Sequence, residues 1–296
     1  MISLITRRLL GGLLATAAIS GAFLTSANQG KQAFADSNKK ILAVGSTALQ
    51  PLAQQVGEKY QDKHPSTQIQ IQGGGSGSGL TQISNDSVQI GNSDIFANQQ
   101  KGINPNKIKD HKVAAVGFAP VVNKSVKVKN LTKDQLQGIF SGKIKNWKQV
   151  GGKNKKITVV NRANGSGTRV TFDDNVMGNQ KPKTTQEQDS NGTVQKVVRK
   201  TPGSISYLSF YYIHKKGIKP IKLNQVKPIN KNITNNKWPI WSYEHMYTKN
   251  KPSSSVKKYI KTFHKESTKD DIKKLGYIPL SSMKVTKNSN NQVTKK

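Results

Sequence analysis

Four short segments with the pattern of a β-strand, at residues 41–44, 68–72, 88–90 and 157–160, each run directly into a turn of small polar residues. The turns read "GST", "GGGSGSGL", "GNSD" and "NRANGSGT". Apolar residues recur at helical spacing over 49–60, after the first turn, and another helix can begin at Leu80. Repeated units of strand, turn and helix predict an α/β fold. In such folds the turns gather at the carboxyl edge of a sheet, where ligands bind.

The first 35 residues predict a signal peptide, which places the protein outside the cell or at its surface. Arg7 and Arg8 precede an apolar run at 9–24, and "AFA" at 33–35 has the small-x-small cleavage pattern. An uncleaved membrane anchor is the alternative, although the run is short and contains glycine for a spanning helix. The chain has no cysteine, so no lipid anchor can be attached at the cleavage site and no disulfide can form.

The chain is strongly basic. Removing residues 1–35 takes away three positive charges and no acid, so the formal charge of +33 becomes +30. Lysines supply most of this charge and are spread along the chain with few aromatic residues between them, a pattern that does not favour nucleic acid as a partner. An anionic cell-wall polymer or membrane surface fits better. The alternative is that the lysines only confer solubility.

The order of the segments predicts two lobes. The apolar run at 113–122 can cross from one lobe to the other, and the unit at 157–172 repeats the arrangement of the first lobe. We expect a first lobe at 36–118, a second lobe at 119–220, a return segment with a C-terminal helix of the first lobe at 221–283, and a disordered polar tail at 284–296.

The shared composition of the four turns predicts a site for a buried tetrahedral oxyanion. Glycine lets another group approach the backbone closely, and the N–H groups at a helix start point outward with the positive end of the helix dipole behind them. Serine and threonine hydroxyls add donors. One such turn is weak evidence, because these residues cap helices in most proteins, but four together are stronger evidence.

Two charged residues define the expected chemistry of this site. Arg162 supplies a planar fork suited to two oxygens of one anion, unless it forms a surface ion pair. Asp94 repels an anion unless the anion brings a proton that the carboxylate can accept. This residue therefore predicts acceptance of phosphate and rejection of fully ionised sulfate, unless Asp94 only caps a helix.

The sequence offers little support for catalysis, a metal site or a cofactor. The five histidines stand alone in lysine-rich contexts and are expected at the surface. No pair of histidines has zinc-ligand spacing. The glycine-rich turn lacks the Lys-Ser/Thr ending of a P-loop, and no G-x-S-x-G elbow occurs. We therefore expect no catalytic residue and no metal ligand.

Seven motifs extend the pattern over nearly the whole chain after residue 35: "VGSTALQPL", "GGGSGSGL", "IGNSD", "LTKDQLQGIFSGKIKNW", "NRANGSGTRVTF", "PGSISYL" and "LGYIPL". In this order they resemble the phosphate-binding proteins of bacterial phosphate-specific ABC transporters. The resemblance implies an α/β, two-lobed fold of the type II periplasmic-binding-protein-like class, with the ligand cleft between the lobes. It also implies a monomer that passes inorganic phosphate to membrane permease subunits.

Carried over motif by motif, the resemblance places the phosphate contacts on ten residues: Ser46, Thr47, Ser76, Gly77, Ser93, Asp94, Arg162, Ser166, Gly167 and Thr168. Two features depart from the family. Relatives from cells with a single membrane are commonly lipid-anchored, which this chain cannot be without cysteine. Ser206 stands where the family usually has glycine, at a place outside the proposed site.

Three other functions stay open from the sequence. The protein could be a receptor for another tetrahedral oxyanion, although Asp94 argues against sulfate. It could be a basic cell-surface or adhesion protein with a vestigial cleft, which the charge favours and the intact motifs oppose. An enzyme that acts on phosphoesters is the third alternative, and no nucleophile–base pair supports it.

Overall fold

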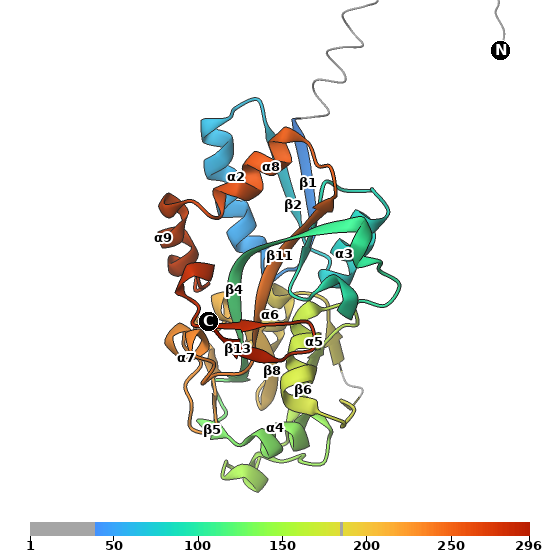
Figure 1. The fold of residues 1–296 in the computed structure, drawn as a ribbon. Helices are drawn as coiled ribbons and strands as arrows, with labels where there is room; N and C mark the ends of the chain where they lie inside the picture. Colours follow the sequence, from blue (N-terminus) through green and yellow to red (C-terminus); the bar gives the residue numbers. More distant parts are fainter. Residues whose placement is uncertain (1–38, 184–185) are drawn as a thin grey trace, which may run out of the picture. The chain divides into compact units, whose positions relative to one another are not determined.

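The computed structural model describes residues 39–183 and 186–296, so the predicted signal peptide at 1–35 lies outside the described residues. Within this part, most strands join one curled nine-stranded sheet in the order β2-β1-β3-β11-β4-β8-β6-β7, with β9 also paired to β4 (Figure 1). The first three strands are parallel to one another, as the repeated strand–turn–helix units predict. The mixed α/β architecture confirms the predicted fold class.

The first lobe is the part of the sheet at the β2 end, with the helices that cover it. Its strands are β1 (Lys40–Gly45), β2 (Gln68–Gln72) and β3 (Ile90–Ser93), and β11 (Trp241–Lys249) returns to join them. Its helices are α2 (Gln50–Lys63), α3 (Ser76–Ser84), α8 (Ser254–Thr262) and α9 (Glu266–Lys274). The apolar spacing at 49–60 correctly predicts α2, whose buried residues include Leu52, Val56 and Tyr60.

The second lobe is built at the other end of the sheet. Its strands are β8 (Ser204–Ser209), β6 (Thr158–Arg162) and β7 (Gln186–Gln188), and its helices are α4 (Lys133–Phe140), α5 (Gly167–Phe172) and α6 (Asn191–Lys200). The long strand β4 (Ile108–Asn123) belongs to both lobes: it pairs with β11 up to Gly117 and with β8 from Phe118. The predicted limits of the lobes stay a prediction, because one continuous strand carries the transition.

Shorter elements complete the chain. They are β5 (Asn130–Leu131), β9 (Ile218–Pro220), β10 (Lys222–Leu223), α7 (Asn230–Thr234), β12 (Val285–Lys287) and β13 (Val293–Lys295), with 3-10 turns at Ala97–Gln99, Pro105–Lys107, Trp147–Val150, Phe210–Tyr212 and Leu280–Ser282 and a π-helical turn at Asp173–Met177. Because β10 pairs with β5, the chain is still beside the second lobe at residue 223.

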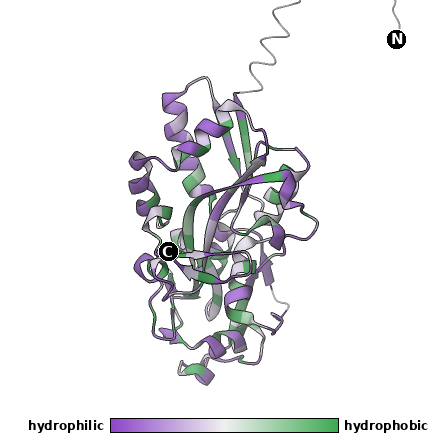
Figure 2. Ribbon diagram, viewed as in Figure 1, coloured by the Kyte–Doolittle hydropathy of each residue, from purple (hydrophilic) through white to green (hydrophobic). Residues whose placement is uncertain are grey.

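Apolar residues concentrate on the strands, and the outer helices are hydrophilic on their exposed faces (Figure 2). In the second lobe, Phe172 and Tyr207 stack with their ring centroids 3.9 Å apart, and Phe140 packs against both. Burying one such ring contributes roughly 1.5–3 kcal/mol. These rings fix α5, which starts at a predicted site residue, against the sheet.

The prediction of a disordered tail at 284–296 is wrong. Strands β12 and β13 form an antiparallel hairpin, and Lys287 is buried with its Nζ donating to the carbonyl oxygen of Trp241 at 2.8 Å. The polar composition of this segment suggested disorder, but a lysine can bury its aliphatic stem while its amine donates to acceptors in the protein. Ser289 accepts from Asn98 of the first lobe at 2.9 Å. Asn291 donates to Asn175 of the second lobe at 3.2 Å, so the hairpin touches both lobes.

Candidate functional site

Asp94 is the centre of the candidate site. It follows β3 directly and is 2% exposed. The hydroxyl of Ser46 donates to its Oδ1, and the hydroxyl of Thr168 donates to its Oδ2 at 3.0 Å. Its own N–H donates to Oγ of Ser76 at 2.9 Å. Residues from the other three predicted turns therefore meet at Asp94, two of them at its carboxylate and one at its backbone N–H.

The glycine-rich turn opens helix α3 and lies against the second lobe. Gly75 has φ +85°, a left-handed conformation that favours glycine, and it precedes the helix at its N-terminus. The N–H of Gly77 donates to the carbonyl oxygen of Gly165 at 2.9 Å. This glycine-rich turn is thus the packed start of a helix, and it contacts the turn "NRANGSGT" of the second lobe.

Gly167 shows how closely the two lobes meet. A Cβ at this position would lie 2.2 Å from Oγ of Ser76 and 2.9 Å from Cβ of Asp94. Both distances are below any ordinary contact, so only glycine allows α5 to approach the first lobe this closely. The described conformation is therefore a closed one, in which residues of both lobes bury Asp94.

Arg162 ends β6 and is 1% exposed. Its Nη2 donates to the carbonyl oxygen of Asp189 at 2.9 Å and its Nε donates to that of Gln188 at 3.3 Å. Its Nη1 has no partner among the described residues. Burial lowers the pKa of Arg162, and the nearby carboxylate of Asp94 acts in the opposite direction. The guanidinium is held by two carbonyls while one donor stays available to an anion.

The other predicted residues lie close by but are engaged elsewhere. Oγ1 of Thr47 accepts from the backbone and side-chain N–H groups of Asn191 at 3.2 and 3.1 Å. The hydroxyl of Ser93 bonds within its own loop, to the backbone of Ile95. Ser166 caps α5 by accepting from a backbone N–H of that helix at 3.3 Å. The structure does not join these three side chains to Asp94 directly.

The order of strand, Gly-Ser-Thr turn and helix at 41–60 predicts Ser46 or Thr47 as the N-cap of the helix, and this prediction is wrong. The helix begins at Gln50, so neither Ser46 nor Thr47 is its N-cap. Ser46 instead accepts from the N–H groups of Ala48 and Leu49, each at 3.0 Å, in a turn that precedes the helix. Its hydroxyl thus fixes this turn as an acceptor while it donates to Asp94.

Sequence reasoning missed two residues of β11 that line this site. Oγ of Ser242 donates to the carbonyl oxygen of Asp94. Two residues later, on the same face of the strand, Glu244 is fully buried and lies opposite Asp94 in the pairing of β11 with β3. An acid inside the otherwise apolar and aromatic segment "WSYEHMY" was the available signal, because buried carboxyl groups need a specific reason.

The expectation that all five histidines lie at the surface is wrong for His245. This residue is fully buried on β11, and its Nδ1 lies 2.8 Å from Oδ1 of Asp110. His245 stands in the segment "WSYEHMY", which contains no lysine, on a strand that lies inside the sheet between β3 and β4. The described residues contain no group of three or more His, Asp or Glu side chains placed to hold a metal ion.

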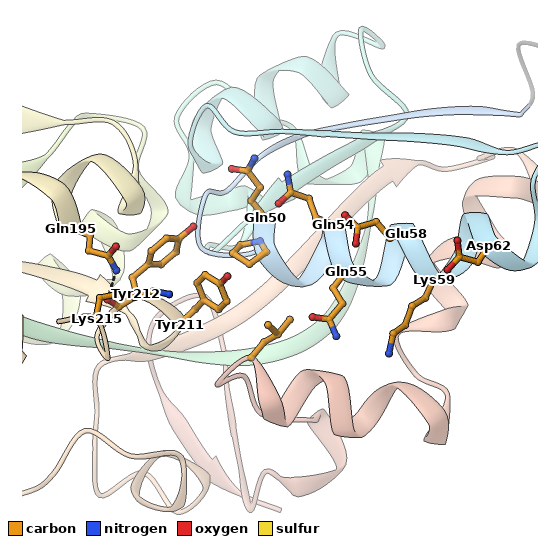
Figure 3. Close-up of a pocket in the computed structure, with 12 residues that line it drawn as sticks. Gln50, Gln54, Gln55, Glu58, Lys59, Asp62, Gln195, Tyr211, Tyr212 and Lys215 are labelled. Atoms are coloured by element: carbon orange, nitrogen blue, oxygen red, sulfur yellow. Dashed lines mark hydrogen bonds between the residues drawn. The ribbon is translucent and has the colours of Figure 1, made fainter.

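A groove of about 690 Å³ lies between α2 and the turn at Phe210–Tyr212. Figure 3 shows the residues that line it. Residues of α2, including Gln50, Gln54 and Glu58, form one wall, and Tyr211 and Tyr212 face them. None of the ten predicted residues lines this groove. The buried cluster around Asp94 is therefore a separate feature from this groove.

No helix in the described part of the chain has the length and apolarity needed to cross a membrane. This finding concerns residues 39–183 and 186–296 and does not bear on the predicted signal peptide.

Known proteins with similar sequences and folds include phosphate-binding proteins. Residues 25–271 match the PBP superfamily domain. The chain is 41% identical to phosphate-binding protein PstS of Bacillus subtilis over 94% of this chain and 95% of that protein. It is 31% identical to PstS of Staphylococcus epidermidis over 70% of this chain and 68% of that protein.

Two solved structures share the fold. A substrate-binding protein from Clostridium perfringens with bound phosphate has a TM-score of 0.77 and 27% identity, over 81% of this chain and 99% of its own. An ABC-type phosphate transport receptor from Vibrio cholerae has a TM-score of 0.66 and 30% identity, over 80% of this chain and 99% of its own. The chain therefore belongs to the PBP superfamily, in the family of the phosphate-binding proteins named PstS.

Proposed function

We propose that this protein captures inorganic phosphate and delivers it to the membrane permease subunits of an ABC importer. The observation that carries the proposal is the pairing of Asp94, a buried acceptor between two lobes, with Arg162, a buried cation with one unused donor. The names of the relatives and the phosphate bound to the Clostridium protein support it.

The ten residues predicted from the motifs are the proposed phosphate contacts. Arg162 would neutralise the anion, and the hydroxyl of Ser76, whose oxygen accepts from the N–H of Asp94, would donate its proton to the anion. Ser46 and Thr168 would lie against the anion while their hydroxyls keep donating to Asp94. Asp94 would accept a hydrogen bond from the P–OH group of phosphate, because an ionised carboxylate can accept a hydrogen bond but cannot donate one. Closure of the two lobes would then exclude water from the ligand.

Calorimetric titration of the purified protein with phosphate, arsenate and sulfate tests the proposal. We expect binding of phosphate and of arsenate, which also carries a proton near neutral pH, and little binding of sulfate. Absence of phosphate binding would overturn the proposed function. Sulfate binding equal to that of phosphate would leave an oxyanion receptor but remove the role given to Asp94.

Replacement of Asp94 by asparagine should weaken the discrimination against sulfate. The amide can donate to an unprotonated oxygen and no longer repels a fully ionised anion, so we expect the ratio of sulfate to phosphate Kd to fall by about tenfold or more, which corresponds to about 1.4 kcal/mol. The matched control is Asp62→Asn, because Asp62 is exposed on α2. An unchanged ratio in Asp94→Asn would contradict this role.

The proposal contains no catalytic step, metal or cofactor. The relatives named above are binding proteins, and the chemistry assigned to Asp94 and Arg162 is recognition alone. We propose that the protein acts as a monomer outside the cell after removal of the signal peptide.

Retention at the cell surface is proposed to be electrostatic. A formal charge of +30 after residue 35 would attract the protein to anionic cell-wall polymers. Raising salt should release it from intact cells, because the screening length falls from about 10 Å at 0.1 M to about 3 Å at 1 M. A covalently attached surface protein, followed on the same cells, is the control. Persistence of this protein on cells at about 1 M salt would rule out electrostatic retention.

A further inference from the structure

Glu244 occupies a position that none of the proposed contacts explains. It lies on β11 with no exposed surface. The preceding residue on the same face, Ser242, donates to the carbonyl oxygen of Asp94. The pairing register with β4 shifts directly after Glu244, an irregularity of the kind that re-aims side chains in β-sheets. His245 pairs with Ser93 across the antiparallel strands β11 and β3, so Glu244 and Asp94, the next residue of each segment, lie opposite each other.

Both carboxyl oxygens of Glu244 lack a hydrogen-bond donor among the described residues. The residue opposite Glu244, directly after β3, is Asp94, whose carboxylate is itself an acceptor. Two ionised carboxylates in this arrangement repel each other, whereas one shared proton joins them. Burial, and then the charge of Asp94, hold the pKa of Glu244 well above its usual range. The proton therefore belongs on the Glu244 side of the pair.

The other titratable groups near Glu244 do not offer it a counter-charge. Tyr277 and Tyr212 face it, and burial raises the pKa of both phenols, to about 12 for Tyr212. Both hydroxyls donate to backbone carbonyl oxygens instead. The cation of the site, Arg162, faces Asp94. Among the described residues, Asp94 is therefore the partner that can take a hydrogen bond from Glu244.

An ionised carboxylate has about four acceptor positions. At Asp94, Ser46 and Thr168 each fill one of these positions. A hydrogen bond from Glu244 fills a third position and leaves one for a proton on the ligand. We propose that Glu244 is a neutral acid of the phosphate site, which shares one proton with Asp94 and so keeps the carboxyl pair at a single negative charge.

Glu244 acts through Asp94 and is a positioning residue, and the inference rests on the proposed function because phosphate must lie beside Asp94. The sign of the pH effect follows from the raised pKa of Glu244. Below that pKa the acid is neutral and the site carries one carboxylate. As pH rises through it, the proton leaves to solvent, a second negative charge appears beside the anion, and binding weakens.

The test compares phosphate titrations of the wild type and Glu244→Gln between about pH 6 and pH 9, a range that brackets a strongly raised carboxyl pKa. Glutamine keeps the shape and a donor but cannot ionise. The titration of phosphate itself affects both proteins equally. We expect the phosphate affinity of the wild type to fall over this range by about tenfold more than the affinity of Glu244→Gln. A tenfold change in affinity corresponds to a shift of one pKa unit in Glu244 between the free and the phosphate-bound protein. Glu58→Gln, on the exposed face of α2, is the matched control and should follow the wild type.

Parallel pH profiles for the wild type and Glu244→Gln would overturn the inference. A Glu244→Asp variant keeps an ionisable group, so its phosphate affinity should fall at alkaline pH by more than that of Glu244→Gln. These outcomes are distinct from failure of the proposed function, in which the wild type would bind no phosphate even at the acid end of the range.

A second measurement needs no variant and applies if Glu244→Gln does not fold. The chain contains four glutamates, Glu58, Glu187, Glu244 and Glu266, and the other three are exposed. Carbon-13 labelling of glutamate side chains therefore gives a carboxyl NMR spectrum with few signals. We expect one signal in the phosphate-bound protein to remain protonated at neutral pH. Four ionised signals at neutral pH would overturn the inference.

Discussion

Replacing Gly167 with alanine should weaken phosphate binding by about 10- to 100-fold, which corresponds to the 1–3 kcal/mol typical of overpacking. The added methyl group would meet Oγ of Ser76 at 2.2 Å and Cβ of Asp94 at 2.9 Å. The Ser76 hydroxyl cannot turn away without losing the N–H of Asp94, to which it is bonded at 2.9 Å. The added methyl group collides with these atoms only when the two lobes meet, so the substitution disfavours the closed conformation.

Because Gly167→Ala should disfavour only the closed conformation, melting temperatures measured with and without phosphate can test the prediction. The melting temperature of Gly167→Ala without phosphate should stay close to that of the wild type, while the rise in melting temperature on adding phosphate should be reduced. Gly192→Ala is the matched control, because a methyl group there meets nothing within 4 Å. An undiminished phosphate-dependent rise in Gly167→Ala would show that the described closed contact is not the phosphate-bound one.

Replacing Arg162 with methionine should weaken phosphate binding by about 100-fold or more, because removal of one partner from a buried charge pair costs about 2–5 kcal/mol. Methionine fills a similar volume but leaves the anion and Asp94 without the buried cation of this site. Calorimetric titration at constant pH and salt measures the loss.

Arg162→Lys serves as the control for this prediction. Lysine restores the charge but not the planar fork, so the two bonds to the carbonyls of Gln188 and Asp189 cannot both form in the same geometry. We expect an affinity between those of the wild type and Arg162→Met. Wild-type affinity in Arg162→Met would place the phosphate elsewhere, and the ten-residue site would have to be abandoned.

Local sequence patterns were sufficient to predict the turns that converge on Asp94. Ser46, Ser76 and Thr168 each follow a strand within a few residues, and parallel strands bring their carboxyl ends together. Gly167 was predicted as a phosphate contact, whereas its close approach to Ser76 and Asp94 of the first lobe is known only from the structure. Whether all ten residues contact phosphate stays a prediction, since Thr47, Ser93 and Ser166 have other partners here.

Glu244 could not be placed from the sequence because its surroundings come from distant parts of the chain. It is 150 residues from Asp94, and β11 enters the sheet between β3 and β4. Alternation within "WSYEHMYTK" does not reveal which strands lie on either side, and the register shift after Glu244 changes the alternation. The buried environment of His245 was hidden for the same reason.

The C-terminal hairpin contacts Asn98 in one lobe and Asn175 in the other, so its tip lies where lobe movement changes its surroundings. The chain has no cysteine, and a single thiol introduced at Ser289 would therefore be the only site for a thiol-reactive dye. Fluorescence from that position would report lobe closure in real time. A bulky fusion after Lys296 would instead crowd the same region, which favours placing affinity tags at the other end of the processed chain.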